Sequence, residues 1–306
     1  MEIICPICNQ GMVLFTRNKD LQKNGDQNIY SAYECNKCNI LFQYPFWKQE
    51  ETYPFYETTY YAHTDNSIIS RSLRILDFYL RDSFYSKLFS PFLKKKLYPF
   101  YDDIVQAKTV LDIGCGKGSF LDVMKKHNKK TYGLEPSDQA SAIAFSKGHT
   151  MITKEFFYSA NKEVKFDLIT MFQVAEHLSV QEIFDENIFS VMYDSLAEGG
   201  RLVIETPNYE CNYAKKYKSN WRALEMPRHL VIFSPSSLSK ILNMQGFATH
   251  VFTRVSPIDV RESFKLQFRE NTIKNRLNKF ITLLKIAINQ KNNSSLVTVI
   301  ARKNSE

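Results

Sequence analysis

Short apolar runs alternate with helical patterns along the middle of the chain. Runs of strand length fall at 110–113, 131–135, 151–152, 165–171 and 199–208, the last opened by a glycine turn. After the first run, Phe120, Leu121, Val123 and Met124 repeat at the spacing of one helix face, and residues 139–147 form a helical stretch that stops at Gly148. Strands alternating with helices predict an α/β fold with a doubly wound parallel sheet.

The last third extends this pattern. A helix is predicted over 236–244 with Gly246 as its stop, followed by a strand over 248–255. Residues 257–292 form a basic helical insertion with an apolar face at 280–288, for which three roles stay open: substrate cover, dimer contact or membrane-facing helix. Residues 296–302 alternate apolar and polar side chains, as is typical of an edge strand.

Two C-x-x-C pairs mark the first module, residues 1–45. Cys5 and Cys8 are separated from Cys35 and Cys38 by a spacer of 26 residues. Four thiolates in tetrahedral reach suit Zn²⁺ and leave no open coordination position, so the spacing predicts a structural zinc ribbon with strands at 12–15 and 40–44. A redox dithiol is the alternative.

Residues 46–100 combine an aromatic stretch with a basic helical one. Rings crowd residues 44–61, and Pro45 and Pro54 break regular structure there, so we expect a linker whose rings pack on the next domain. Residues 67–100 have apolar side chains near helical spacing beside several lysines and arginines. This favours a helical cap over the domain at 101–306, with an interfacial membrane helix as the second interpretation.

Composition and charge narrow the class of protein. The 306 residues are 44% hydrophobic, no apolar run is long enough to span a membrane, and the N-terminus has no signal-peptide pattern. With six cysteines we therefore expect a reducing compartment, the cytoplasm. Lysine and arginine outnumber the acids by 18 to 7 in residues 201–306. This excess of +11 favours an anionic partner there, or is a solvated basic face.

A glycine-rich loop follows the first predicted strand. Gly114, Gly116 and Gly118 alternate after the acid Asp112, and the spacing differs from the G-x-G-x-x-G dinucleotide fingerprint by one residue. Such a strand–turn–helix brings backbone N–H groups close to a ligand. Glu135 ends the second strand, where an acid is placed to accept hydrogen bonds from both ribose hydroxyls.

Four motifs extend this pattern to a family. VLDIGCGKGSF, GLEPS, FDLITMFQVAEHL and LAEGGRLVIETPN resemble, in order and spacing over about 108–208, those of class I S-adenosylmethionine-dependent methyltransferases. The segment from Trp221 to Leu238 resembles the branch of ubiquinone-biosynthesis O-methyltransferases and of sugar and cell-surface glycan enzymes. A preceding zinc ribbon resembles deoxysugar methyltransferases and one group of ribosomal RNA methyltransferases. The resemblance implies a seven-stranded sheet whose last strand is antiparallel.

Carried onto this chain, the resemblance implies a site for S-adenosylmethionine. Asp112 would orient the loop and reach the methionine amino group, while Glu135 would hold the ribose. Gln173 would lie near the sulfonium, Cys115 would be a small residue that fits the turn, and Glu155 or Phe156 would meet the adenine edge. The implied cofactor residues are Asp112, Gly114, Cys115, Gly116, Gly118, Glu135, Pro136, Ser137 and Gln173.

The chemistry needs a group that takes a proton from the acceptor. His177 follows the fourth strand and His229 lies in a segment expected to fold over the same edge, so either is a candidate base. Glu176 and His177 could instead bind a divalent metal, or simply cap the next helix. Arg222 and Arg228 are candidate clamps for a phosphate or carboxylate.

The sequence thus predicts an enzyme, a methyltransferase acting on a small and anionic molecule such as a sugar, nucleotide-linked sugar or glycan precursor. The second interpretation is an RNA methyltransferase whose zinc ribbon and basic last third grip RNA. A third is a binding or scaffold protein that keeps the fold without catalysis. No transmembrane segment is expected, whereas peripheral membrane contact stays open, as does the oligomeric state.

Overall fold

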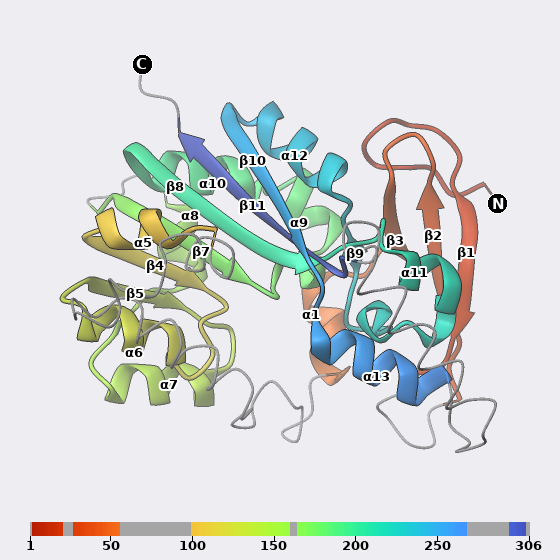
Figure 1. Ribbon diagram of the computed structural model, residues 1–306, viewed down its shortest axis with the longest axis horizontal. Helices are drawn as coiled ribbons and strands as arrows, with labels where there is room; N and C mark the ends of the chain where they lie inside the picture. The colour runs from red at the N-terminus through yellow and green to blue at the C-terminus, as the bar shows by residue number, and fades with distance from the viewer. Residues whose placement is uncertain (1, 21–26, 56–98, 160–163, 268–293, 304–306) are drawn as a thin grey trace, which may run out of the picture.

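The computed structural model describes residues 2–20, 27–55, 99–159, 164–267 and 294–303, which form two sheets (Figure 1). The larger contains β4 (Thr109–Ile113), β5 (Lys130–Leu134), β6 (Thr150–Met151), β7 (Phe166–Phe172), β8 (Leu196–Pro207), β10 (Phe247–Arg254) and β11 (Leu296–Lys303). Its strand order is β10-β11-β8-β7-β4-β5-β6, with β4 to β8 parallel and β11 antiparallel to both neighbours. The predicted doubly wound sheet is confirmed, including its antiparallel last strand.

Helices connect these strands. In Figure 1, α6 (Ser119–Lys126) and α7 (Asp138–Ser146) lie on one side of the sheet, and α10 (Ile188–Ser195) and α12 (Pro235–Met244) on the other. The short helix α5 (Tyr101–Gln106) precedes β4, and α8 (Lys154–Tyr158) and α9 (Val180–Phe184) lie on either side of β7 in the chain. After β8 come α11 (Asn212–Tyr217) and two short 3-10 helices, η4 (Lys218–Asn220) and η5 (Arg222–Leu224). Ser137, Thr153, Ser179 and Ser234 each accept a backbone hydrogen bond as N-caps, which explains where α7, α8, α9 and α12 begin.

The smaller sheet combines the N-terminal strands with a late segment of the chain. β1 (Val13–Asn18), β2 (Tyr30–Cys35) and β3 (Ile40–Tyr44) form an antiparallel meander, and β9 (Val231–Ile232) pairs with β3. β2 was not predicted, although Tyr30 and Ala32 alternate with less buried residues along it. The N-terminal meander and the rest of the chain therefore share one sheet.

The structure describes the aromatic stretch as far as Phe55. After Pro45 come α1 (Gln49–Thr52) and the short η1 (Tyr53–Phe55). The Phe55 ring meets Trp47 and Tyr30 edge-on at 5.8 and 5.9 Å, so this part of the linker packs on the smaller sheet, whereas packing on the following domain was expected. The helical expectation for 67–100 falls almost wholly outside the described residues.

One strand expectation is wrong. Residues 296–302 were expected to form an edge strand, but β11 lies between β8 and β10, and β10 is the edge. The alternation misled because Thr298 is itself buried and donates to Glu205 at 3.0 Å. Of the basic insertion, α13 (Pro257–Gln267) is described and 268–292 is not.

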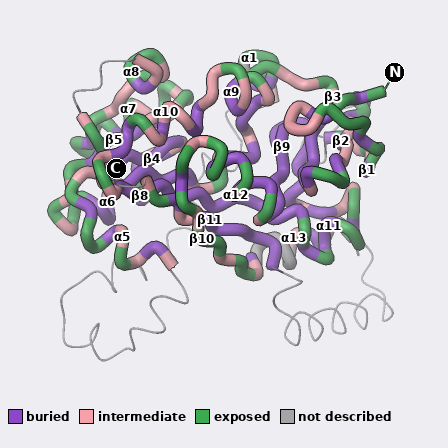
Figure 2. The backbone as a smooth tube through the Cα atoms, turned by 90° about the horizontal axis from the view of Figure 1, so that it is seen from above, coloured by how far each residue is buried: buried purple, intermediate pink, exposed green. Residues whose placement is uncertain are grey.

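The core is continuous across both sheets. One buried cluster contains Cys5, Cys35 and Phe42 of the N-terminal module together with Leu111 and Ile204 of the larger sheet. Buried backbone accordingly runs through both ends of the molecule in Figure 2. In the part of the chain that is described, no helix combines the length and apolar character needed to cross a membrane.

Candidate functional site

The glycine loop joins β4 to α6. Its first glycine is packed against protein atoms, whereas its second glycine faces open space. Gly114, Gly116 and Gly118 all have left-handed backbones, with φ of 70°, 53° and 75°. A Cβ on Gly114 would lie 2.3 Å from Val174, whereas one on Gly116 would meet nothing within 4 Å. The loop therefore packs tightly at its start and faces open space at Gly116, where a ligand can approach the backbone.

Glu135 is held against this loop. One carboxylate oxygen accepts from the Gly116 N–H at 2.8 Å, and the other from the Ser137 N–H at 2.9 Å. Ser137 in turn caps α7 through Ala140 at 3.4 Å. These bonds fix the orientation of the carboxylate while each oxygen keeps a lone pair for a further donor, such as a ribose hydroxyl.

Asp112 lies beneath the loop, 5% exposed, and accepts from the Thr170 hydroxyl at 2.7 Å. Burial raises its pKa to about 7, which the Thr170 hydrogen bond opposes and the charge of Glu135 favours. A cation placed next to Asp112 would restore its charge. Thr170 was not singled out from the sequence, because a lone threonine on a strand gives no signal.

The remaining loop and strand-end residues differ in exposure. The buried Cys115 sulfur would lie 2.7 Å from a Cβ on Gly133, so it packs against β5, and burial raises the pKa of this thiol. Pro136 is exposed. Gln173, directly after β7, is also exposed, and its backbone is left-handed with φ of 57°. Its N–H donates to the Glu205 carbonyl at 2.8 Å.

The second group of candidate residues meets in space as the sequence suggested. His177, at the end of η3 (Ala175–His177), and His229 have ring centroids 4.6 Å apart and nearly perpendicular planes. One ligand atom from each of Glu176, His177 and His229 lies within 4.8 Å of the others. Glu176 is fully buried and accepts from Thr206 at 2.8 Å. The capping alternative fails for α9, which is capped by Ser179 and Glu182.

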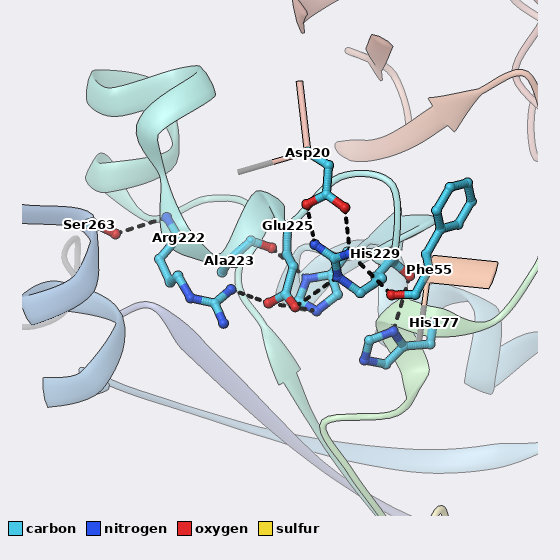
Figure 3. A network of polar contacts seen from close by, with 9 residues as sticks. Asp20, Phe55, His177, Arg222, Ala223, Glu225, His229 and Ser263 are labelled. Atoms are coloured by element: carbon cyan, nitrogen blue, oxygen red, sulfur yellow. Dashed lines mark hydrogen bonds and ion pairs between the residues drawn. The ribbon is translucent and has the colours of Figure 1, made fainter. Parts of the chain in front are cut away.

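Both imidazoles have a defined tautomer. His177 Nδ1 lies 3.0 Å from the Arg228 carbonyl, and His229 Nδ1 lies 2.7 Å from the Ala223 carbonyl (Figure 3). A carbonyl only accepts, so each Nδ1 carries the proton and each Nε2 carries the lone pair. Burial lowers the pKa of His177, and it lowers that of His229 to about 3 although Glu225 opposes this. Both rings are therefore neutral at pH 7.

A buried charge network surrounds the histidines (Figure 3). Arg228 is 2% exposed and makes two bonds to Asp20, at 2.7 and 2.6 Å, and a third to Glu225 at 3.3 Å. Arg222 also pairs with Glu225. Burial would raise the pKa of Glu225, but His229 and both arginines lower it to about 2.

The expectation that Arg228 clamps a substrate anion is therefore wrong, because its guanidinium holds carboxylates of the protein itself. Sequence reasoning missed both of those carboxylates. Asp20 lies 208 residues before Arg228 in a polar stretch that gave no signal. Glu225 lies between Arg222 and Arg228, and nothing in the sequence indicated a role for it beyond its place in the segment from Trp221 to Leu238.

The four N-terminal cysteines form a second cluster. Their sulfurs lie within 4.8 Å of one another, and Cys8 and Cys35 approach to 3.5 Å. Tetrahedral Zn–S bonds of about 2.3 Å place sulfurs ~3.8 Å apart, so the spacing fits. Both pairs end in the same turn: Asn9 and Asn39 are left-handed, with φ of 55° and 54°, and bond back to the first cysteine of their pair. Each turn thus brings the two sulfurs of its pair to the same four-sulfur cluster.

Comparisons with known proteins identify the family. Residues 81–250, more than half of the chain, match the model of the methyltransferase domain family, so this chain belongs to that family. A methyltransferase from Geobacillus is 31% identical over 104 residues, 32% of this chain and 42% of the relative. An uncharacterized methyltransferase from Staphylococcus carnosus is 27% identical over 111 residues, 36% of this chain and 51% of the relative. The match thus spans about half the length of these curated relatives.

Among solved structures, a SAM-dependent methyltransferase from Archaeoglobus fulgidus is 20% identical with a TM-score of 0.49. It covers 69% of this chain and 93% of its own.

Proposed function

We propose that the chain is an S-adenosylmethionine-dependent methyltransferase. The observation that carries the proposal is Glu135, whose carboxylate is fixed against Gly116 at the open side of the loop. Family membership supports it. The test is a screen for S-adenosylhomocysteine formation with nucleotide sugars, quinol precursors and RNA as acceptors. Product above the no-acceptor background in one class supports the proposal, and background throughout together with no cofactor binding contradicts it.

The residues would divide the work of holding the cofactor, which supplies the methyl group. The Glu135 carboxylate would accept hydrogen bonds from both ribose hydroxyls, and Pro136 and Ser137 would flank the adenine. Asp112, whose pKa burial raises to about 7, would ionise next to the ammonium of the methionine part. Gln173 would lie by the sulfonium. The chain would thus contribute alignment for an in-line displacement rather than covalent chemistry.

We propose His177 as the base that takes the proton from the acceptor. It keeps some exposed surface, whereas His229 is 6% exposed and, with a pKa of about 3, is the weaker base. His229 and Glu176 would then orient the acceptor. His177→Gln should lower turnover by about 10²-fold or more with unchanged cofactor affinity. The matched control is His250→Gln on the exposed edge strand β10, and equal turnover in both variants would contradict the assignment.

A divalent metal is the second role for the same residues, and one observation favours it. Glu176, His177 and His229 place a carboxylate oxygen and two nitrogens within 4.8 Å, and neutral imidazoles are what a metal binds. Turnover that is lost on chelation and restored by Mg²⁺ or Mn²⁺, ions that thiolates bind poorly, would select this role. Turnover restored only by Zn²⁺ would point to the cysteines instead.

For the acceptor we propose a small anionic molecule, such as a sugar, a nucleotide-linked sugar or a glycan precursor. The basic last third supports an anionic acceptor. RNA is the alternative, and it would show as binding that weakens steeply between 50 and 200 mM salt. Six basic residues of that third lie outside the described part: Arg269, Lys274, Arg276, Lys279, Lys285 and Lys291.

We propose a structural Zn²⁺ on Cys5, Cys8, Cys35 and Cys38. The sulfur spacing and the repeated asparagine turn support it, and all four cysteines are free thiols. Such a small module gains its folding energy from the metal. Metal analysis of the purified protein should give one zinc per chain, reduced to none in Cys38→Ser.

A further inference from the structure

We propose that the N-terminal module, here residues 2–20 and 27–44 with the four cysteines, positions the histidine pair His177 and His229. This rests on the proposed function. The module would hold the acceptor side of the site and leave the cofactor loop independent of it. Asp20 is then a positioning residue that acts through Arg228, and loading of the four cysteines with metal would govern the histidines without touching the cofactor site.

The first link is the buried ion pair. Asp20 and Arg228 are 4% and 2% exposed, and their two parallel hydrogen bonds of 2.7 and 2.6 Å fix the guanidinium in plane and direction. The backbone carbonyl of Arg228 is the acceptor of His177 Nδ1 at 3.0 Å. A side chain of the N-terminal module is therefore two contacts from the proposed base.

The second link runs through Leu230, which lies next to His229. Its carbonyl accepts from the Gln43 N–H of β3 at 2.8 Å, and its own N–H donates to the Glu176 carbonyl at 2.7 Å. Directly after it, Val231 and Ile232 pair with Phe42 and Leu41. One residue thus ties the N-terminal sheet to the segment that carries His177.

Glu225 joins the two links. Its carboxylate contacts Arg222, bonds Arg228 at 3.3 Å and faces His229 Nε2 at 3.7 Å. His229 is also held by the Ala223 carbonyl at 2.7 Å. Within residues 222–230, the short η5 (Arg222–Leu224) is followed by a turn in which the Arg228 and His229 N–H groups donate to the Glu225 carbonyl at 2.9 and 3.2 Å, and a strand forms only where β9 pairs with β3. This segment is held at both ends: at its start Ser263 of α13 accepts from the Arg222 N–H at 3.0 Å, and the N-terminal module holds its end through Asp20 and the pairing of β9 with β3.

The cofactor loop is held differently. Gly114 bonds the Leu134 carbonyl at 2.7 Å, Gly116 bonds Glu135 at 2.8 Å, and Gly114 packs on Val174. These partners belong to β5, its C-terminal end and the turn after β7. None of these partners belongs to the N-terminal module, although the Val174 carbonyl also accepts from the His177 N–H at 2.9 Å, so both halves of the site share the turn after β7.

The test uses the full chain labelled with ¹⁵N-histidine and loaded with zinc. Two quantities are measured: the Nδ1–H signals of His177 and His229, assigned from His177→Gln and His229→Gln, and the affinity for S-adenosylmethionine. The variants are Asp20→Asn and, as a matched control, Glu34→Gln. Glu34 accepts from the Tyr209 hydroxyl, so loss of its charge weakens another contact between module and domain outside residues 222–230.

In Asp20→Asn we expect both Nδ1–H signals to shift, or to disappear by exchange with water. The dissociation constant for S-adenosylmethionine should stay within threefold of the wild-type value. In Glu34→Gln both the histidine signals and this dissociation constant should be unchanged. Removal of zinc from the wild type should have the same effect as Asp20→Asn. Unchanged histidine signals overturn the proposal, as does a loss of cofactor affinity above tenfold that accompanies them. If Asp20→Asn does not fold, the zinc-removal arm decides by the same two readouts. A wild type that binds no cofactor refutes the proposed function, while the histidine signals still test the positioning.

Discussion

The two halves of the candidate site are built in opposite ways. The cofactor half is built from segments that are close together in the sequence: the end of β4, its glycine loop and the end of β5 lie within 26 residues, from Asp112 to Ser137. The acceptor half brings together Asp20, Glu176, His177 and residues 222–230 through buried charges and through hydrogen bonds to backbone carbonyls. The first is fixed by local geometry and the second by contacts between distant segments.

This difference matters for stability as well as for function. Left-handed glycines and N–H···carboxylate bonds form wherever the chain adopts the strand–turn–helix. A buried Asp–Arg pair costs desolvation energy for both charges, which is offset only when both partners are in place. The acceptor half should therefore be the more easily lost.

The largest effect is expected from breaking the buried pair. Asp20→Ala leaves the Arg228 charge with Glu225 but without its two strongest bonds, and should lower the free energy of unfolding by about 3–5 kcal/mol. The double variant Asp20→Leu/Arg228→Met, which removes both charges, should lose much less. Urea unfolding measures both, and a loss below about 1 kcal/mol in the single variant would show that the pair is not coupled to the fold.

A pair of glycine variants comes next and separates packing from ligand space. Gly114→Ala combines a left-handed backbone with overlap on Val174 at 2.3 Å and should cost about 3 kcal/mol of stability. Gly116→Ala has only the backbone strain, about 1 kcal/mol, but its methyl group would enter the open side. We expect it to lower cofactor affinity at least tenfold in calorimetry. Equal stability of the two variants would contradict the described packing.

The third effect is a pH dependence caused by Asp112. Its pKa in the folded protein, about 7, lies above the ordinary value of 3.8, so the folded state binds more protons between these values. Stability from this group is present at low pH and is lost as pH rises toward 7, by at most about 1.4 kcal/mol per pH unit. Unfolding at pH 5.5 and 6.5 should show the slope in the wild type, and Asp112→Asn should reduce it. An identical slope in both proteins would rule Asp112 out as its source.

The smallest effect is expected at Cys115. Its sulfur packs on Gly133 behind the loop, so Cys115→Ala should cost about 1 kcal/mol of stability and leave cofactor affinity within twofold. Calorimetry on the variant gives the answer. A larger fall in affinity would mean that the side chain, and not only the backbone, takes part in the cofactor site.

What the sequence revealed follows this division only in part. The loop and Glu135 were predictable because they depend on motifs at strand ends that meet at one edge of a parallel sheet, and the proximity of His177 to His229 followed from the expectation that the segment around His229 folds over that edge. Asp20 was not, since nothing in a polar stretch indicates a partner 208 residues away. Arg228 was misjudged for the same reason: whether an arginine serves a ligand or a buried carboxylate depends on its partner.

The strand pattern had a similar limit. Alternation places one strand face toward the core, but it does not tell whether a further strand lies beside it. β11 therefore looked like an edge, and only the pairing of β10 with it at Phe247–Arg254 places it inside the sheet. β9 is two residues long and becomes a strand only by pairing with β3.

The cofactor site itself is tested most directly by calorimetry of S-adenosylmethionine with the zinc-loaded wild type and with Glu135→Gln, an isosteric change that keeps the shape of the side chain. We predict saturable one-to-one binding to the wild type and an affinity lower by about 10- to 100-fold in the variant, because a charged acceptor for the ribose hydroxyls is lost. Absence of binding to the wild type, or equal affinity in the two proteins, would contradict the account.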